Sequence, residues 1–162
     1  MKRIRTLLCG VLALFGLAAC EEFAIKDLRP GVSTGFEVRD RLGPPGIEWR
    51  NGDGTVTWEY SMQPAGTTCY LITLDANNVV QAVDQVLTEA QFARITPGLD
   101  QTQVRRLIGK PAKTTFHALK QETVHDWLID NSDRLALVYF NVYFDQQGRV
   151  VRTGRYTERL GN

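Results

Sequence analysis

The chain has 162 residues, with 19 Lys or Arg against 18 Asp or Glu, so its formal net charge is only +1. Nucleic-acid-binding domains gather basic residues on one face, and this near-balance without a basic cluster argues against a nucleic-acid partner. The length is enough for one domain or for two small ones.

The N-terminal segment has the pattern of a secretory signal peptide. Lys2, Arg3 and Arg5 precede an apolar run of about a dozen residues, which ends in small residues. The run is too short for a membrane-spanning helix, which needs roughly 20 apolar residues. We therefore expect residues 1–19 to be removed. Because they hold three basic residues and no acidic one, residues 20–162 carry 16 basic and 18 acidic groups, a net charge of about −2.

The segment Leu17-Ala18-Ala19-Cys20 resembles the lipobox of bacterial lipoproteins. The resemblance implies cleavage before Cys20, followed by attachment of palmitate and related acyl chains to its thiol and its new amino group. Several acyl chains anchor a protein stably, whereas a single chain binds a membrane only reversibly. Glu21 follows the cysteine, and enterobacterial lipoproteins retained in the inner membrane have Asp there, so the resemblance favours the periplasmic face of the outer membrane. The alternative is an ordinary signal peptide cut after an Ala-x-Ala-like site.

Cys69 is the one thiol that export and acylation leave free, because Cys9 lies in the segment to be removed. A single thiol makes no internal disulfide, so the fold must depend on a hydrophobic core. A Cys–His enzyme or a metal site would combine Cys69 with His117, His125 and Asp126. No catalytic signature surrounds Cys69, which falls within an expected strand, so we expect a buried, inert cysteine, no enzyme activity and no cofactor.

The exported part of the chain contains an internal repeat, with copies at residues 20–87 and 88–162. Each copy begins with a Phe-Ala pair and then a Pro-Gly pair, at 30–31 and at 97–98. The spacing between equivalent residues drifts along the chain, which places insertions in loops, where they are tolerated. The short stretch at 88–91 is the expected junction of the two copies.

Each Pro-Gly pair is followed by a predicted helix. Residues 34–37 and 100–103 have helix-capping patterns, and a Gly with a Pro soon after it ends each helix at 43–45 and 109–111. The apolar residues of these helices are Phe36, Val38 and Leu42 in the first copy and Val104, Leu107 and Ile108 in the second.

Strands follow each predicted helix. Polar–apolar alternation and β-branched or aromatic runs predict strands at 55–60, 69–75 and 79–86 and again at 123–129, 139–145 and 149–156. Trp58 and Trp127 occupy equivalent places, which predicts that they pack between helix and sheet. The predicted fold is α+β, with two tandem units, each made of short helices followed by a three- or four-stranded antiparallel sheet.

Residues 87–98 and 104–111 resemble the SmpA/OmlA family of small outer-membrane lipoproteins, to which the assembly factor BamE belongs. Residues 28–45 and 58–60 match the same pattern. The resemblance implies a unit of two short helices packed on a three-stranded antiparallel sheet. The tandem pair also resembles the β-lactamase-inhibitor-protein architecture, in which two copies form one curved sheet.

The family resemblance implies a non-catalytic periplasmic protein that binds an envelope partner, such as the β-barrel assembly machinery, and supports outer-membrane protein assembly or envelope integrity. The assembly factor has one unit where this chain has two, and its partner-contacting residues have no match here. The alternative function is an inhibitor or ligand-binding module that uses a joined concave sheet against a periplasmic enzyme.

The middle strand of each copy has two different faces. One face carries Tyr70, Ile72 and Leu74 or Phe140, Val142 and Phe144, which we predict to be core. The other face mixes aromatic and polar residues, and tyrosine buries area while keeping a polar group available. With Asp126 nearby, the candidate partner-binding residues are Tyr139, Asn141, Tyr143, Leu71 and Glu59. The alternative is a face covered by the protein's own loops.

Overall fold

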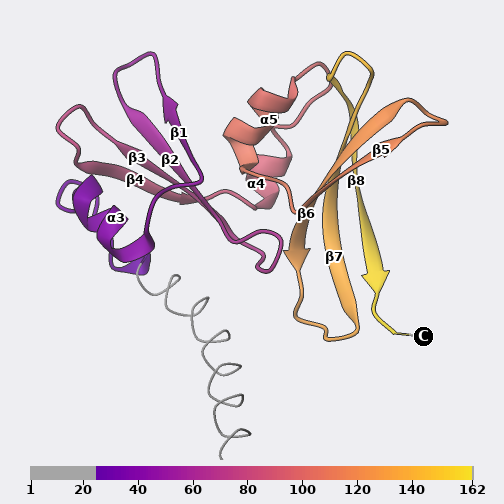
Figure 1. Ribbon diagram of the computed structural model, residues 1–162, viewed down its shortest axis with the longest axis horizontal. Coiled ribbons are helices and arrows are strands. Elements are labelled where there is room, and N and C mark those ends of the chain that lie inside the picture. The colour runs from indigo at the N-terminus through magenta and orange to yellow at the C-terminus, as the bar shows by residue number, and fades with distance from the viewer. Residues whose placement is uncertain (1–24, 162) are drawn as a thin grey trace, which may run out of the picture. The chain divides into compact units, whose positions relative to one another are not determined.

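The computed structural model describes residues 25–161 (Figure 1), so the predicted signal peptide and Cys20 lie outside the described residues. Two four-stranded antiparallel sheets form, in the orders β1-β2-β3-β4 and β5-β6-β7-β8. The first copy supplies α3 (Gly35–Leu42), β1 (Ile47–Arg50), β2 (Val56–Ser61), β3 (Cys69–Leu74) and β4 (Val80–Gln85). The second copy supplies α4 (Glu89–Phe92), α5 (Gln101–Ile108), β5 (Lys113–His117), β6 (Glu122–Asp130), β7 (Ala136–Phe144) and β8 (Val150–Arg159).

The predicted α+β fold with two tandem sheet units is confirmed. The edge strands β1 and β5 are additions to the predicted strands. Both are short, with four and five residues, and β5 is exposed at four of its five positions. β1 alternates but spans only four residues, and β5 has a single partly buried position, so neither gives a strong strand signal in the sequence.

The two longer helices begin and end where their caps predict. The Thr34 hydroxyl accepts a hydrogen bond from the Glu37 amide at the start of α3. At the start of α5, Asp100 accepts from the Gln103 amide (2.8 Å), and the Gln103 side chain accepts from the Asp100 amide (2.9 Å), a complete capping box. Gly43 and Gly109 end the helices with φ of +74° and +72°, a left-handed conformation that favours glycine.

The apolar residues of α3 differ in burial, because Phe36 is 80% exposed while Val38 is fully buried. Gly35 lies so close to the sheet that a methyl group in its place would fall 2.8 Å from the Leu74 side chain. The buried stripe of this eight-residue helix therefore runs through Gly35 and Val38, three residues apart, and Phe36 lies about 100° around the helix from Gly35.

The repeat detected in the sequence recurs in the hydrogen bonds of the two β-hairpin turns. The Asp75 carboxylate accepts from the amides of Asn77 and Val79, each at 2.9 Å. The Asp145 carboxylate, 70 positions later, accepts in the same way from Gln147 and Arg149, also at 2.9 Å. Both aspartates fix a tight turn by binding the backbone two and four residues ahead.

The Pro-Gly pairs join each copy's N-terminal segment to its last strand. Gly31 donates its amide to the carbonyl of Val80 (2.7 Å), and Gly98 donates to the carbonyl of Val150 (2.9 Å). The amides of Val80 and Val150 in turn donate to the carbonyls of Ser33 and Leu99, each at 2.8 Å. The N-terminal segments of the two copies therefore pair with the last strand in the same way.

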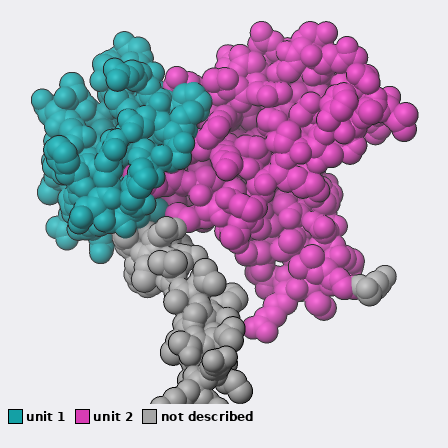
Figure 2. All heavy atoms as spheres, viewed as in Figure 1, with its two compact units in different colours: residues 1–58, 72–83 teal, residues 59–71, 84–162 magenta. Residues whose placement is uncertain are grey.

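The chain divides into two compact units, drawn in different colours in Figure 2. Unit 1 comprises the described residues up to Trp58 together with 72–83, and unit 2 comprises 59–71 together with 84 onward. The predicted boundary between residues 87 and 88 thus separates the two copies of the sequence repeat, but it does not separate the compact units, because each unit contains two separate segments of the chain. Cys69 and Leu71, from the first copy, belong to the hydrophobic core of unit 2.

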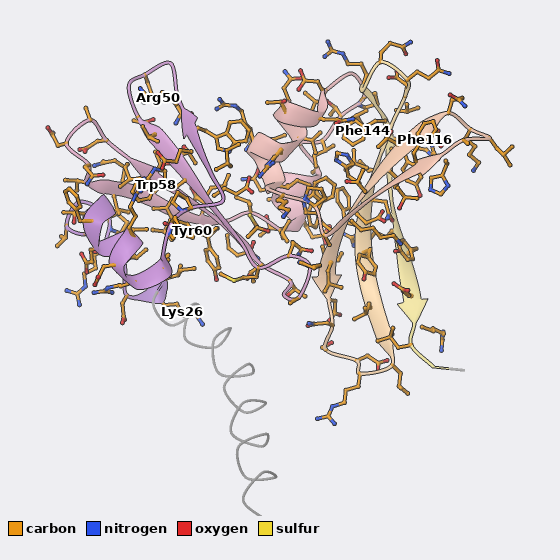
Figure 3. The ribbon with its side chains drawn as sticks, in the orientation of Figure 1. Lys26, Arg50, Trp58, Tyr60, Phe116 and Phe144 are labelled. Atoms are coloured by element: carbon orange, nitrogen blue, oxygen red, sulfur yellow. The ribbon has the colours of Figure 1, made fainter. Side chains whose placement is uncertain are left out.

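The core of unit 2 lies between α4, α5 and one face of the β5–β8 sheet. Phe144, labelled in Figure 3, is fully buried, and the rings of Phe92 and Phe140 stack with their centroids 4.1 Å apart. Trp127 is buried and donates its indole N–H to the carbonyl of Gly109 at the end of α5 (3.1 Å). Trp58 of unit 1 is likewise buried, with the Arg39 guanidinium of α3 4.5 Å from its ring centroid. Both tryptophans therefore pack between helix and sheet, as predicted.

Candidate binding face on the second sheet

The β5–β8 sheet has one face against the core and one face away from it. Side chains alternate along a strand, and residues paired across an antiparallel ladder share a face. Trp127 pairs with Phe140 and therefore faces the core, whereas Asp126 pairs with Asn141 on the opposite side. We call that opposite side the outer face; it includes Lys113, Thr115, His117, Glu122, Val124, Asp126, Leu128, Tyr139, Asn141, Tyr143, Arg152, Gly154 and Tyr156.

Aromatic residues cover much of the outer face. The rings of Tyr139 and Tyr156 stack across β7 and β8, with centroids 5.0 Å apart and planes 13° from parallel. The Arg152 guanidinium lies 3.7 Å from the Tyr143 ring centroid and also binds both carboxylate oxygens of Glu122 (2.5 and 3.0 Å). Burial raises the pKa of Tyr156 to about 12, and burial likewise raises the pKa of Tyr139. Both hydroxyls therefore keep their protons at physiological pH.

A buried polar pair lies at the centre of this face. Asp126 is 4% exposed and Asn141 only 1%, and the amide nitrogen of Asn141 donates to the Asp126 carboxylate at 2.5 Å. The side-chain oxygen of Asn141 has no hydrogen-bond partner among the described residues. A buried acceptor without a donor costs roughly 1–3 kcal/mol, so this pair does not stabilise the fold as a satisfied network would.

A pocket of about 400 Å³ opens over the Asp126–Asn141 pair. Its volume falls within the ordinary range of ligand sites, roughly 300–1,000 Å³. The remaining lining residues are Lys113, Thr115, His117, Lys120, Glu122, Val124, Tyr143 and Tyr156. The pocket thus has a buried polar floor, aromatic walls and a rim of exposed basic side chains.

The structure brings together three of the five candidate residues predicted from the sequence. Tyr139, Asn141 and Tyr143 share the outer face. Leu71 is placed differently, because it is 9% exposed and packs in the hydrophobic core of unit 2. Glu59 is 1% exposed and accepts two hydrogen bonds from Arg105 of α5, at 2.9 and 3.1 Å. The assignment of Leu71 and Glu59 to a surface is therefore corrected, since both are interior residues.

Cys69 is also an interior residue, with no exposed surface. Burial, with a smaller contribution from the neighbouring Glu59 carboxylate, raises its pKa to about 12. Its thiol is therefore protonated and unreactive at physiological pH, in agreement with the expected buried cysteine.

Burial lowers the pKa of His125, whose ring centroid lies 4.7 Å from that of Phe144. Within residues 25–161, no group of three His, Cys, Asp or Glu residues is arranged to hold a metal ion.

Two parts of the pocket were missed from the sequence. Lys113 and His117 lie on β5, and the Lys-Thr-Thr-Phe-His run has weak alternation that indicates such a strand only faintly. Tyr156 was recognised as a strand residue, but its stacking on Tyr139 depends on the β7–β8 register. Phe116, labelled in Figure 3, remains 59% exposed on the same edge strand.

No known protein family and no curated protein matches the sequence of this chain. Among solved structures, it is similar to a DUF4309 family protein, YjgB, from Bacillus subtilis subsp. subtilis str. 168, at 10% identity and a TM-score of 0.32. The match covers 86% of this chain and 93% of that one. A likeness this weak has no bearing on function. No helix of residues 25–161 is long and apolar enough to cross a membrane.

Proposed function

We propose that this protein is a lipid-anchored lipoprotein on the periplasmic face of the outer membrane, where it binds a protein partner through the outer face of the β5–β8 sheet. By this contact it supports outer-membrane protein assembly or envelope integrity. The observation that carries the binding proposal is the Asp126–Asn141 pair, buried yet incompletely hydrogen-bonded under an open pocket.

The tyrosines of the outer face favour a protein partner. Tyr139, Tyr143 and Tyr156 are half-buried, so each offers part of a large rigid ring and a hydroxyl to a second molecule. Tyrosine is enriched at binding hot spots because it buries much area at little cost in conformational entropy. Buried acceptors in native proteins are usually hydrogen-bonded, so a donor brought to Asn141 Oδ1 by a partner would make a favourable contact.

The lipobox supports the anchoring part of the proposal. Only four residues separate Cys20 from Ile25, where the described part begins. A fully extended chain spans about 3.5 Å per residue, so an anchor on Cys20 would hold unit 1 within roughly 20 Å of the lipid. A partner of this protein would then have to be membrane-bound or to approach the membrane surface.

Capture of a partner from detergent-solubilised membranes tests the proposal. Wild-type protein is expected to retain envelope proteins, including β-barrel assembly components, and Tyr139→Ala/Tyr143→Ala is expected to lose most of them, since hot-spot truncations cost about 2 kcal/mol or more each. The control is Phe36→Ala, which removes an aromatic ring that is 80% exposed in unit 1.

Two outcomes of this capture would count against the proposal. Equal capture by the tyrosine variant and the wild type would exclude the outer face as the binding surface. A stoichiometric complex with a soluble periplasmic enzyme would indicate the inhibitor function instead. In a parallel fractionation, Cys20→Ser is expected to leave the membrane fraction, and its full retention there would contradict lipid anchoring.

A further inference from the structure

The floor of the outer-face pocket contains a hydrogen-bond acceptor that has no donor. Asn141 uses its amide nitrogen on Asp126, which leaves its oxygen buried and without a donor. The second oxygen of the Asp126 carboxylate has no hydrogen bond among the described residues. A molecule that brings hydrogen-bond donors to this floor would satisfy both oxygens.

The floor also carries an unpaired negative charge. Asp126 is 4% exposed, and within residues 25–161 no Lys or Arg forms an ion pair with its carboxylate. Lys113 is its cross-strand neighbour, yet Lys113 is exposed and makes no such pair. Burying a carboxylate without a counter-charge is costly, so a cationic donor gains more here than a neutral one.

The pocket walls suit a planar cation. Tyr143 and Tyr156 line it, and a guanidinium stacks on tyrosine with a favourable cation–π energy of about 0.5–2 kcal/mol. The outer face already contains one such contact, that of Arg152 on Tyr143. A guanidinium also carries five N–H donors in a rigid plane, so one group can donate to the Asp126 carboxylate and to the Asn141 oxygen, whereas an ammonium is a single point charge.

The rim of the pocket is basic and favours acidic groups, whereas the floor favours a cation. Lys113 and Lys120 are exposed lining residues, and neither has an ion-pair partner within residues 25–161. They would repel a strongly basic segment but attract carboxylates on either side of a single inserted cation. The pocket therefore distinguishes a lone arginine between acidic residues from a run of basic residues.

We propose that the outer-face pocket receives one arginine side chain from an acidic segment of the partner protein, with the guanidinium on Asp126 and Asn141 and the flanking carboxylates on Lys113 and Lys120. The inference rests on the proposed function, since it names the chemistry of the partner. It makes Asp126 the recognition residue of the face and the tyrosines its walls.

Peptide titration tests the pocket without the natural partner. The exported chain, residues 20–162 with Cys20→Ser for solubility, is titrated with acetyl-Glu-Arg-Glu-amide while the side-chain amide resonances of Asn141 are followed by NMR. Saturable shifts are expected at millimolar peptide, with affinity lower by roughly tenfold or more when citrulline replaces the arginine, because a charge-assisted hydrogen bond contributes about 1.5–3 kcal/mol. Equal binding of both peptides, or no shift with either, would overturn the inference.

Asp126→Asn is the matching protein variant. It keeps the shape of the side chain, and its new amide can donate to the Asn141 oxygen, so we expect it to fold with undiminished stability. It should lose arginine-peptide binding by roughly tenfold or more. The double variant Lys113→Ser/Lys120→Ser should still bind the arginine peptide more tightly than the citrulline peptide. It should no longer gain affinity from the two glutamates that flank the arginine. If those glutamates still raise the affinity as in the wild type, the two lysines do not bind the flanking carboxylates.

Partner capture then separates the two proposals. If Asp126→Asn captures the same membrane partners as the wild type, the arginine inference fails while the outer face can still be the binding surface through its tyrosines. If neither protein captures a partner, the proposed function fails, and the peptide titration still decides what the pocket binds. A glycan or other neutral polyol that shifts Asn141 while the peptide does not would also overturn the inference.

Discussion

Gly109→Ala is expected to reduce the free energy of unfolding by about 3–5 kcal/mol, which is large for a single added methyl group. Two causes add together. Gly109 has a φ of +72°, which strains an alanine, and the new Cβ would lie 2.2 Å from the sulfur of Cys69. The contact is with a fully buried side chain in the core of unit 2, so neither group moves away easily. Urea denaturation monitored by tryptophan fluorescence measures the loss.

Gly43→Ala is the control for this prediction. Gly43 ends α3 with nearly the same φ, +74°, but a Cβ there meets no atom within 4 Å. Only the backbone strain applies, so its expected cost is about 1 kcal/mol. Adding Cys69→Ala to Gly109→Ala should recover part of the loss by removing the sulfur. If Gly43→Ala and Gly109→Ala lowered the free energy of unfolding equally, and Cys69→Ala recovered none of the loss, Gly109 would not pack closely against Cys69.

Arg105→Met is expected to cost about 3–5 kcal/mol, because it leaves the Glu59 carboxylate buried without its counter-charge. Glu59 is 1% exposed, and Arg105 binds both of its oxygens through two nitrogens, at 2.9 and 3.1 Å. The pair joins α5 to the segment 59–71 within unit 2. Thermal and urea denaturation should both report the loss.

Two variants distinguish burial from charge as the source of this effect. Glu59→Leu/Arg105→Leu removes both charges and should recover most of the stability, since an apolar pair can replace a buried ion pair at little cost. Arg41→Met breaks the exposed Arg41–Glu37 pair of α3, which contributes only about 0.3–0.5 kcal/mol. If Arg105→Met were as mild as Arg41→Met, the Glu59–Arg105 pair would not be a buried interaction.

Local chemistry explains which parts of the fold were predictable. The caps at Thr34 and Asp100 and the terminating glycines Gly43 and Gly109 act within one or two turns of chain, so the sequence alone locates both helices. Strand alternation likewise separated Phe140, Val142 and Phe144 from Tyr139, Asn141 and Tyr143, and the first set is buried as predicted. A pattern of period two assigns residues to faces without any knowledge of the neighbouring strands.

The parts that were not predictable depend on contacts between distant residues. Leu71 and Glu59 lie at strand positions that fit a surface face. The segment 59–71 nevertheless belongs to unit 2, and Leu71 packs in the core of that unit, a placement that no local pattern encodes. Phe36 is apolar, yet it lies about 200° around α3 from the buried Val38 and is exposed, since Gly35 rather than Phe36 approaches the sheet. The Asp126–Asn141 bond joins residues 15 positions apart and exists only in one strand register.

The most direct measurement of the central claim is in-cell photocrosslinking from two positions of β8 that face opposite ways. Tyr156 pairs with Tyr139 on the outer face, whereas Thr153 pairs with Val142 on the core-facing side and is itself exposed. A photoreactive residue at 156 is expected to crosslink the full-length, membrane-anchored protein to a partner, and the same residue at 153 is expected to give little or none. Stronger crosslinking from 153, or equal crosslinking from both, would contradict binding through the outer face.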